Sequence, residues 1–230
     1  FLNDLVSQVQ ADERITLHMA TTVDVVDGFV GNFTTKLTNG TSVAHGAILI
    51  ATGGQEYRPT EYGYADSDRV ITQRELEDQL ALQDPANEQS YVMIQCVGSR
   101  EEPHNYCSRI CCQDALKNAI AIKEKAPDAQ VVVLYRDMRS YGLKEEYYKK
   151  ARDLGVLFFL YVPEEKPKVE LEGERCRVRF ESKVLHREML VEADYLVLST
   201  GLRPQPDVER LSKKSKLTCN LDNFFLEAHV

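Results

Sequence analysis

The feature that most constrains the fold is a regular alternation of strands and helices that begins at residue 91. Strands are predicted over residues 91–97, 130–136 and 156–161, with helices over residues 111–125 and 144–154 between them. Strands joined by helices of this length form a parallel sheet through right-handed crossovers. The sequence therefore predicts an α/β fold in which helices cover both faces of a parallel sheet.

The regions on either side of this alternation carry strand patterns of a different kind. Short stretches in which β-branched and polar residues alternate predict further strands, with hairpin turns at two glycine-containing pairs. These strands span residues 15–25, 29–37, 168–171 and 176–181, and the turns lie at Asp27-Gly28 and Asn39-Gly40. Helices are predicted over residues 2–12 and 72–82, the second opening with a capping box of Thr72 and Glu75. An antiparallel β excursion therefore accompanies the parallel sheet.

One strand pattern occurs twice. Strands are predicted over residues 43–51 and 195–199. Residues 47–51 of the first and all of the second are largely apolar, as strands buried on both faces are, and each strand runs into Thr-Gly with Arg-Pro a few residues later. A glycine at the exit of a strand lets the backbone approach a ligand closely. The candidate cofactor-binding residues are therefore Thr52, Gly53, Gly54, Thr200 and Gly201.

This recurrence predicts the domain organisation. Each copy follows a hairpin of exposed strands, which is how a Rossmann-like, dinucleotide-binding domain ends. The chain is expected to hold the last part of one such domain over residues 1–86, a second domain over residues 87–204, and a connecting segment over residues 205–230. It starts without methionine and enters a helical pattern at once, so we expect a segment of a longer protein.

Four of the six cysteines lie within seventeen residues, and two of them are adjacent. They are Cys96, Cys107, Cys111 and Cys112. Cysteines that staple a small secreted domain are spread along the chain, whereas tight spacing without a secretory signal indicates metal, cluster or redox chemistry. Cys96 ends a predicted strand, and the other three come just before or inside the first turn of the next helix, whose partial positive charge favours thiolates.

Several kinds of site are compatible with these cysteines. Four convergent thiolates are the ligand set of a [4Fe-4S] cluster, and the same set can hold zinc. A redox-active cysteine pair and four merely buried thiols are further alternatives. The intervals of ten, three and no residues match neither a ferredoxin nor a zinc-knuckle pattern.

Three segments carry a resemblance to a known family. Residues 95–100 (QCVGSR), 106–112 (YCSRICC) and 134–142 (LYRDMRSYG) are similar to the inner domain of the A-type subunit of heterodisulfide reductase, within the flavoproteins that have tandem FAD and NAD domains. The resemblance implies an FAD-type first domain, to which Thr52, Gly53 and Gly54 contribute part of the flavin site, and an NAD-like second domain. It also implies an oxidoreductase subunit that relays electrons between FAD and iron-sulfur centres, with other iron-sulfur subunits as partners.

The composition and one turn exclude other classes of function. The net charge of -8 and the scattered basic residues disfavour nucleic acid, and no apolar run is long enough to span a bilayer. We therefore expect a soluble, cytoplasmic protein. Residues 96–103 (CVGSREEP) lack the glycines that cradle a nucleotide pyrophosphate, which argues against nicotinamide binding. The alternatives are a binding or assembly domain with a zinc or empty cysteine site, and a pyridine nucleotide-disulfide oxidoreductase that uses a cysteine pair.

Overall fold

The computed structural model describes residues 1–226, and these form two compact units. The first unit comprises Phe1–Gly53 and the segment from Pro204 onward, and the second comprises Gly54–Arg203. The division after Gly53 differs from the expected boundary at residue 86. The reason is that residues 70–72 pair with the sheet of the second unit, so the helix that follows them packs there too.

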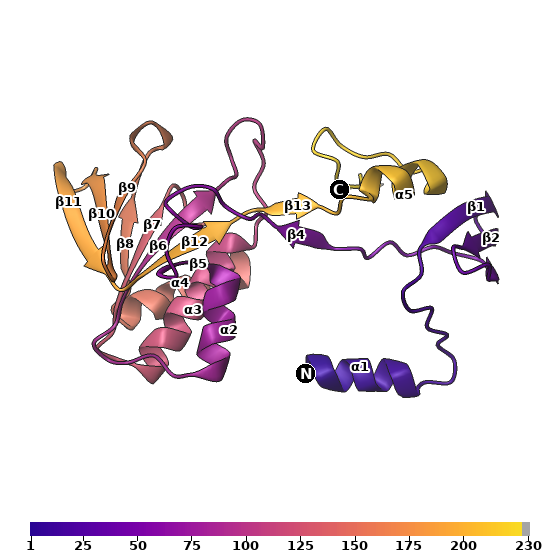
Figure 1. Cartoon of the computed structure of the whole chain (residues 1–230), viewed down its shortest axis with the longest axis horizontal. Helices are drawn as coiled ribbons and strands as arrows, with labels where there is room; N and C mark the ends of the chain where they lie inside the picture. The colour runs from indigo at the N-terminus through magenta and orange to yellow at the C-terminus, as the bar shows by residue number, and fades with distance from the viewer. Residues whose placement is uncertain (227–230) are drawn as a thin grey trace. The chain divides into compact units, whose positions relative to one another are not determined.

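The second unit is built on a parallel sheet of five strands in the order β5-β12-β6-β7-β8 (Figure 1). The strands are β5 (Val70–Thr72), β6 (Ser90–Val97), β7 (Gln130–Tyr135), β8 (Leu157–Leu160) and β12 (Tyr195–Thr200). Every residue of β6 is buried, because this strand has parallel neighbours on both sides and covered faces above and below. The α/β fold with a parallel sheet is therefore confirmed.

The two faces of this sheet are covered differently. Helices α2 (Gln73–Leu82), α3 (Cys111–Lys125) and α4 (Glu145–Asp153) cover one face (Figure 1). The other face packs against an antiparallel sheet of β9 (Lys168–Glu172), β10 (Arg175–Ser182) and β11 (Arg187–Ala193). Helices were expected on both faces; instead, β10 buries Cys176, Val178 and Phe180 in alternation with more exposed arginines, so this sheet presents a complete apolar face.

Local sequence signals account for the start of α2. The Thr72 side chain accepts a hydrogen bond from the Glu75 amide, and the Glu75 carboxylate accepts one from the Thr72 amide. Both halves of the expected capping box are therefore present. Leu76 and Leu80 of this helix are buried in one apolar cluster with residues of α3, which fixes α2 beside the cysteine-bearing helix.

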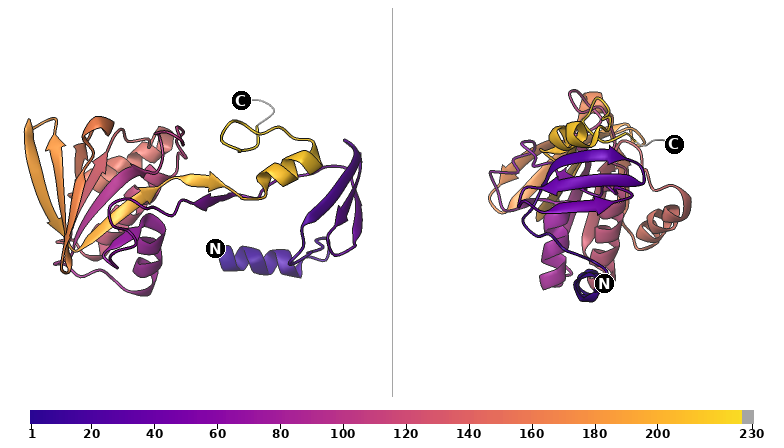
Figure 2. Two further views of the ribbon diagram at one scale, coloured as in Figure 1. Left: turned by 45° about the horizontal axis from the view of Figure 1, so that its top comes forward. Right: turned by 90° about the vertical axis from the view of Figure 1, so that its right-hand side faces the viewer.

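The first unit contains a helix, a three-stranded antiparallel sheet and a second helix. These are α1 (Leu2–Ala11), β1 (Val23–Phe29), β2 (Asn32–Leu37), β3 (Ser42–His45) and α5 (Val208–Ser215). The Lys214 ammonium of α5 donates to the Val23 carbonyl and to Asp24 of β1, 3.2 and 3.1 Å away, and Figure 2 shows α5 beside this sheet. The connecting segment after residue 204 therefore includes a helix that completes the first unit.

Three sequence predictions in this unit were wrong in detail. The strand predicted over residues 15–25 begins only at Val23, and residues 15–22 form no strand. The first hairpin turns at Val30 and Gly31, while Gly28 lies inside β1 with a φ of +103°; the turn at Asn39-Gly40 is confirmed. Residues 47–53 form no strand, and Leu49 is 92% exposed. A parallel strand needs a neighbour for its backbone hydrogen bonds, and the described part of the first unit offers this segment none.

The remaining elements are short. Strand β4 (Gly54–Glu56) pairs with β13 (Leu202–Pro204), and two 3-10 turns, η1 (Gly142–Lys144) and η2 (Pro163–Glu165), precede α4 and β9. Among the described residues, no helix is both long and apolar enough to cross a membrane.

Candidate functional site

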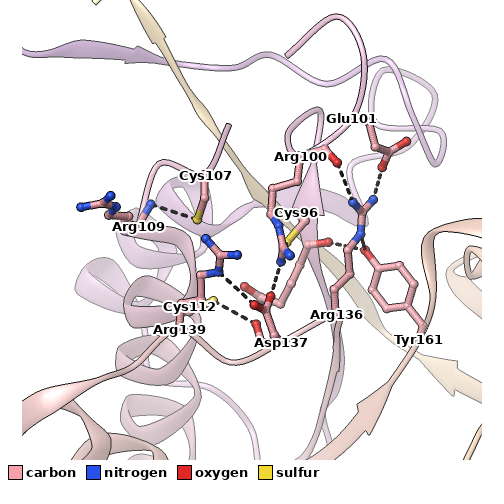
Figure 3. A network of polar contacts seen from close by, with 11 residues as sticks. Cys96, Arg100, Glu101, Cys107, Arg109, Cys112, Arg136, Asp137, Arg139 and Tyr161 are labelled. Carbon is pink, nitrogen blue, oxygen red and sulfur yellow. Dashed lines mark hydrogen bonds and ion pairs between the residues drawn. The ribbon is translucent and has the colours of Figure 1, made fainter. Parts of the chain in front are cut away.

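The four clustered cysteines lie where the parallel sheet meets the first helix that follows it. Cys96 is the penultimate residue of β6, Cys107 lies in the loop after that strand, and Cys111 and Cys112 are the first two residues of α3. The carboxyl end of β6 and the amino end of α3 are therefore the supports of the site, and the loop brings Cys107 back toward them (Figure 3). The sequence predicted this placement, which is where open parallel sheets bind ligands.

The electrostatics show that the four sulfur atoms are neighbours. Burial, together with charge on Cys112, Cys96 and Cys107, raises the pKa of Cys111 to about 12. Burial likewise raises the pKa of Cys112 to about 11, with Cys96 and Cys107 again contributing. All six cysteines are free thiols, so none of the four is held in a disulfide.

These shifts correct one expectation about the thiols. The start of α3 was expected to favour thiolates, but burial outweighs the helix dipole at Cys111 and Cys112. Without a bound cation both side chains are neutral near pH 7, and the Cys111 thiol donates to the Thr200 carbonyl oxygen, 3.0 Å away. A metal that binds here must therefore displace protons and supply the positive charge that keeps the thiolates stable.

Hydrogen bonds to sulfur surround the site. The Arg100 guanidinium donates from Nη1 to Cys96 Sγ at 3.7 Å, and the Arg109 backbone amide donates to Cys107 Sγ at 3.4 Å. Arg100 also pairs with Asp137, which follows β7, and Arg139 donates to the same carboxylate at 2.9 Å (Figure 3). The site is therefore lined by donors, which is the environment that sulfur atoms carrying negative charge require.

Two glycines let the cysteine loop close onto the sheet. Gly98 has a φ of +64°, and a Cβ added there would stand 2.1 Å from a ring carbon of Tyr57. Gly201 lies against the loop as well, because its Cβ would stand 3.0 Å from that of Ser99. The second predicted Thr-Gly pair thus packs against the cysteine loop, with the Thr200 hydroxyl bonded to Glu56 at 3.1 Å.

Sequence reasoning missed the residue that holds this loop in place. Arg203 stacks on the Tyr57 ring with its guanidinium carbon 4.3 Å from the ring centre, and it donates to the Gly98 carbonyl at 2.6 Å. It also donates to the Tyr106 hydroxyl, which in turn donates to the Leu202 carbonyl. The only signal for this role was the Arg-Pro pair that recurs after each Thr-Gly.

A polar cavity of about 330 Å³ lies beside Cys96. Arg136 and Tyr161 line it, and the Tyr161 hydroxyl donates to the Gln95 carbonyl at 2.6 Å. The Arg136 side chain is only 6% exposed and pairs with Glu101 (Figure 3). The cavity therefore brings solvent and polar groups close to a sulfur atom at an otherwise buried strand end.

The first predicted Thr-Gly pair lies outside the second unit, which holds the four cysteines. Thr52 and Gly53 belong to the first unit, where the Thr52 carbonyl accepts from Gln205 Nε2 at 3.3 Å. Gly53 has a φ of +63°, and Gly54 begins β4.

A single metal ion and a four-iron cluster need differently spaced thiols. Among residues 1–226, no three histidine, cysteine, aspartate or glutamate side chains are grouped closely enough to hold a single metal ion. A zinc ion needs such a group because all four ligands bind one atom. A four-iron cluster binds each thiolate to a different iron, so it fits thiols that are neighbours without converging on one point.

Comparison with known proteins yields relatives of one kind. The chain is 40% identical over 205 residues to the A-type iron-sulfur subunit of the CoB-CoM heterodisulfide reductase of Methanocaldococcus jannaschii, a match that covers 80% of this chain. It is 38% identical over 205 residues to the corresponding subunit of an H2/formate-dependent heterodisulfide, ferredoxin reductase of Methanococcus maripaludis. The chain is homologous to the A-type subunit of heterodisulfide reductase. It spans about a third of that subunit's length, 31% and 30% in these two relatives, and no protein-family model matches it.

Solved structures show the same fold at low sequence identity. The thioredoxin reductase of T. acidophilum is 12% identical, with a TM-score of 0.60, and the match covers 99% of this chain and 66% of that one. The cadaverine monooxygenase DfoA of Erwinia amylovora, solved bound to FAD, is 13% identical with a TM-score of 0.52, covering 94% of this chain and 60% of that one. The resemblance to heterodisulfide reductase is therefore confirmed in sequence, and the thioredoxin-reductase-like fold in structure.

Proposed function

We propose that this chain is an electron-transferring part of an FAD- and iron-sulfur-dependent oxidoreductase related to heterodisulfide reductase. In this proposal Cys96, Cys107, Cys111 and Cys112 hold a [4Fe-4S] cluster. The observation that carries the proposal is the set of four neighbouring, free and largely buried thiols at the strand-helix turn. The homology to a protein named as an iron-sulfur subunit of a reductase supports it.

The chain's own residues suit electron transfer. A cluster supplies a one-electron site whose potential depends on burial and on hydrogen bonds to sulfur. Cys96, Cys111 and Cys112 are buried, which limits the contact of their sulfur atoms with water, although a cavity lies beside Cys96. The Arg100 guanidinium donates to Cys96 and the Arg109 amide donates to Cys107. The protons of the thiols must leave when the cluster binds, since only thiolates ligate iron.

The phosphate-binding turn of a nicotinamide site is replaced by this constellation. Gly98 is the only glycine between β6 and α3, and it packs against the ring of Tyr57. The amino end of α3, where a pyrophosphate would bind, presents Cys111 and Cys112 instead. Electrons therefore pass through the cysteine site rather than through a nicotinamide bound there.

The remaining candidate cofactor residues divide between two roles. We assign Thr52, Gly53 and Gly54 to contact with FAD, in keeping with the FAD-bound structure of similar fold. We assign Thr200 and Gly201 to the cysteine site, because the Thr200 carbonyl accepts from Cys111 and Gly201 packs on the cysteine loop. The expected partners are other iron-sulfur subunits. A cytoplasmic location suits a chain with six free cysteines, because thiols stay reduced there.

Metal analysis after anaerobic purification tests the proposal. We expect iron and acid-labile sulfide in equal amounts, a broad brown absorbance, and loss of both in Cys96→Ala, Cys107→Ala, Cys111→Ala and Cys112→Ala variants. Cys219→Ala is the matched control, since Cys219 lies in the first unit, and it should retain iron. Zinc in place of iron, or equal iron in all five variants, would contradict the proposal.

Neither alternative from the sequence gains support. A zinc-holding assembly domain would use the same four cysteines, and a relative named as an iron-sulfur subunit favours a cluster over zinc. A pyridine nucleotide-disulfide oxidoreductase needs a reactive thiolate, and burial raises the pKa of both Cys111 and Cys112 far above neutrality.

A further inference from the structure

We propose that Arg100 holds Cys96 in place and raises the reduction potential of the cluster at this site. Arg100 is thus a positioning and potential-setting residue; it is not a ligand. The inference rests on the proposed function, because it concerns the same four-cysteine site. It goes beyond that function because it names the one side chain that sets the reduction potential of the cluster.

The backbone of Arg100 is fixed from several directions. Its φ is +62°, in the left-handed region that arginine seldom adopts. The Arg100 amide is directed at the His104 and Tyr106 carbonyls, 2.9 and 3.1 Å away, and the Arg100 carbonyl accepts from Arg136 Nη1 at 3.2 Å. The structure thus keeps a strained backbone at this position, which indicates that the direction of the side chain matters.

The side chain of Arg100 lies between a thiol and a carboxylate. Nη1 is 3.7 Å from Cys96 Sγ and also pairs with Asp137, and the side chain is only 23% exposed. Arg139 donates to the other oxygen of Asp137, so one carboxylate is held between two guanidinium groups. Arg100, Asp137 and Arg139 together carry one net positive charge against the cysteine site (Figure 3).

No other described side-chain cation has this contact with a cysteine sulfur of the site. Arg136 points toward Glu101 and Tyr161 and makes no hydrogen bond to a cysteine sulfur. Arg109 reaches Cys107 through its backbone amide alone, and this residue is exposed. Arg109 is therefore a natural comparison, since it carries the same charge in the same loop without a side-chain bond to sulfur.

The effect on the potential follows from charge. Reduction adds one electron to the cluster and makes the ligated sulfurs more negative, while no proton moves and no covalent bond changes. A guanidinium that donates to one of these sulfurs stabilises the reduced form more than the oxidised form. Removing the guanidinium must therefore lower the midpoint potential of the cluster. A lysine at this position keeps the charge and should preserve most of the potential.

A redox titration of the anaerobically loaded 230-residue chain tests the inference, with dithionite as the electron donor and electron paramagnetic resonance as the readout. Arg100→Gln should disfavour the reduced form at least tenfold, a fall of about 59 mV for a one-electron couple. Arg109→Gln should shift the potential much less, and Arg100→Lys should lie near the unsubstituted chain. Iron should also leave Arg100→Gln faster than Arg109→Gln when a chelator is added.

The outcomes separate the two proposals. If the unsubstituted chain binds no iron, the proposed function fails and this inference fails with it. If that chain binds iron but Arg100→Gln and Arg109→Gln shift the potential equally, only the inference is overturned. Loss of iron from both Arg100→Gln and Arg100→Lys would also overturn it, because Arg100 would then serve only the fold of the loop. Loss of iron from Arg100→Gln alone, with Arg100→Lys loaded, supports the positioning of Cys96 by a cation.

Discussion

Replacing Gly98 with alanine should destabilise the second unit by an amount that the structure sets. The left-handed φ of +64° costs an alanine about 1–2 kcal/mol. The new Cβ would stand 2.1 Å from the Tyr57 ring and force it away from Arg203, which loses a cation-π contact of about 1–2 kcal/mol. We therefore expect Gly98→Ala to lower the free energy of unfolding by about 2–4 kcal/mol.

Gly155 supplies a matched control for this prediction. It also has a left-handed φ, +87°, but a Cβ added there meets no atom within 4 Å. Gly155→Ala should therefore cost only the backbone strain of about 1–2 kcal/mol. Hydrogen exchange of the buried β6 amides measures the opening free energy of this unit. The reasoning is refuted if Gly98→Ala costs no more than Gly155→Ala, or if Tyr57→Ala fails to reduce the cost of Gly98→Ala.

Three further predictions concern the helix cap at Thr72, the half-buried carboxylate of Asp194 and the thiols of Cys111 and Cys112. Thr72→Ala should destabilise the second unit by about 1 kcal/mol in β6 hydrogen exchange, whereas Thr72→Ser should be nearly neutral, because serine keeps the capping oxygen. Burial raises the pKa of Asp194, but hydrogen bonds from Ser90 and the charges of Arg175 and Arg69 outweigh this effect and leave the pKa below 3.8. Stability should therefore fall as the pH drops below about 4, and Asp194→Asn should reduce this dependence in acid titrations followed by circular dichroism, while carboxylates such as Glu75 and Asp137 keep the rest. In the folded, iron-free chain at about pH 8, Cys111 and Cys112 should be alkylated more slowly than in the chain unfolded in urea. Mass spectrometry of peptides measures both rates, and equal rates would contradict the burial of these thiols.

Local signals in the sequence predicted most of the second unit. The helix that begins at Cys111 was predicted over its observed range, because its apolar residues recur at helical spacing and a strand precedes it. The capping box at Thr72 likewise marked the start of α2. These features depend on neighbours within a few residues, so they can be deduced from the sequence.

Features that depend on distant partners could not be predicted in this way. Residues 47–51 have the composition of a buried strand, yet a strand also needs a pairing neighbour, and composition does not reveal whether one is present. Strand β11 alternates between more and less buried residues, but it was missed because the exposed Leu190 interrupts the alternation of polar and apolar residues in the sequence. The contact of Arg203 with Tyr57 joins residues far apart in the sequence, and neither residue has a local pattern that indicates it.

The position of the candidate site could be predicted from the sequence, and its surroundings could not. Tight spacing and the place at a strand-helix turn marked the cysteines. The approach of Arg100 to Cys96 depends on a left-handed backbone at both residues, with φ values of +62° and +64°. Neither residue type favours that conformation, so only the folded chain reveals the contact.

Native mass spectrometry of the anaerobically prepared chain tests the central claim most directly, since it counts the atoms bound at the cysteine site. If the four cysteines hold a [4Fe-4S] cluster, we expect a mass increase equal to four iron and four sulfide per chain. The increase should be absent from the Cys111→Ala variant and retained in Cys219→Ala. An increase equal to one zinc ion, or an unchanged mass, would contradict the claim.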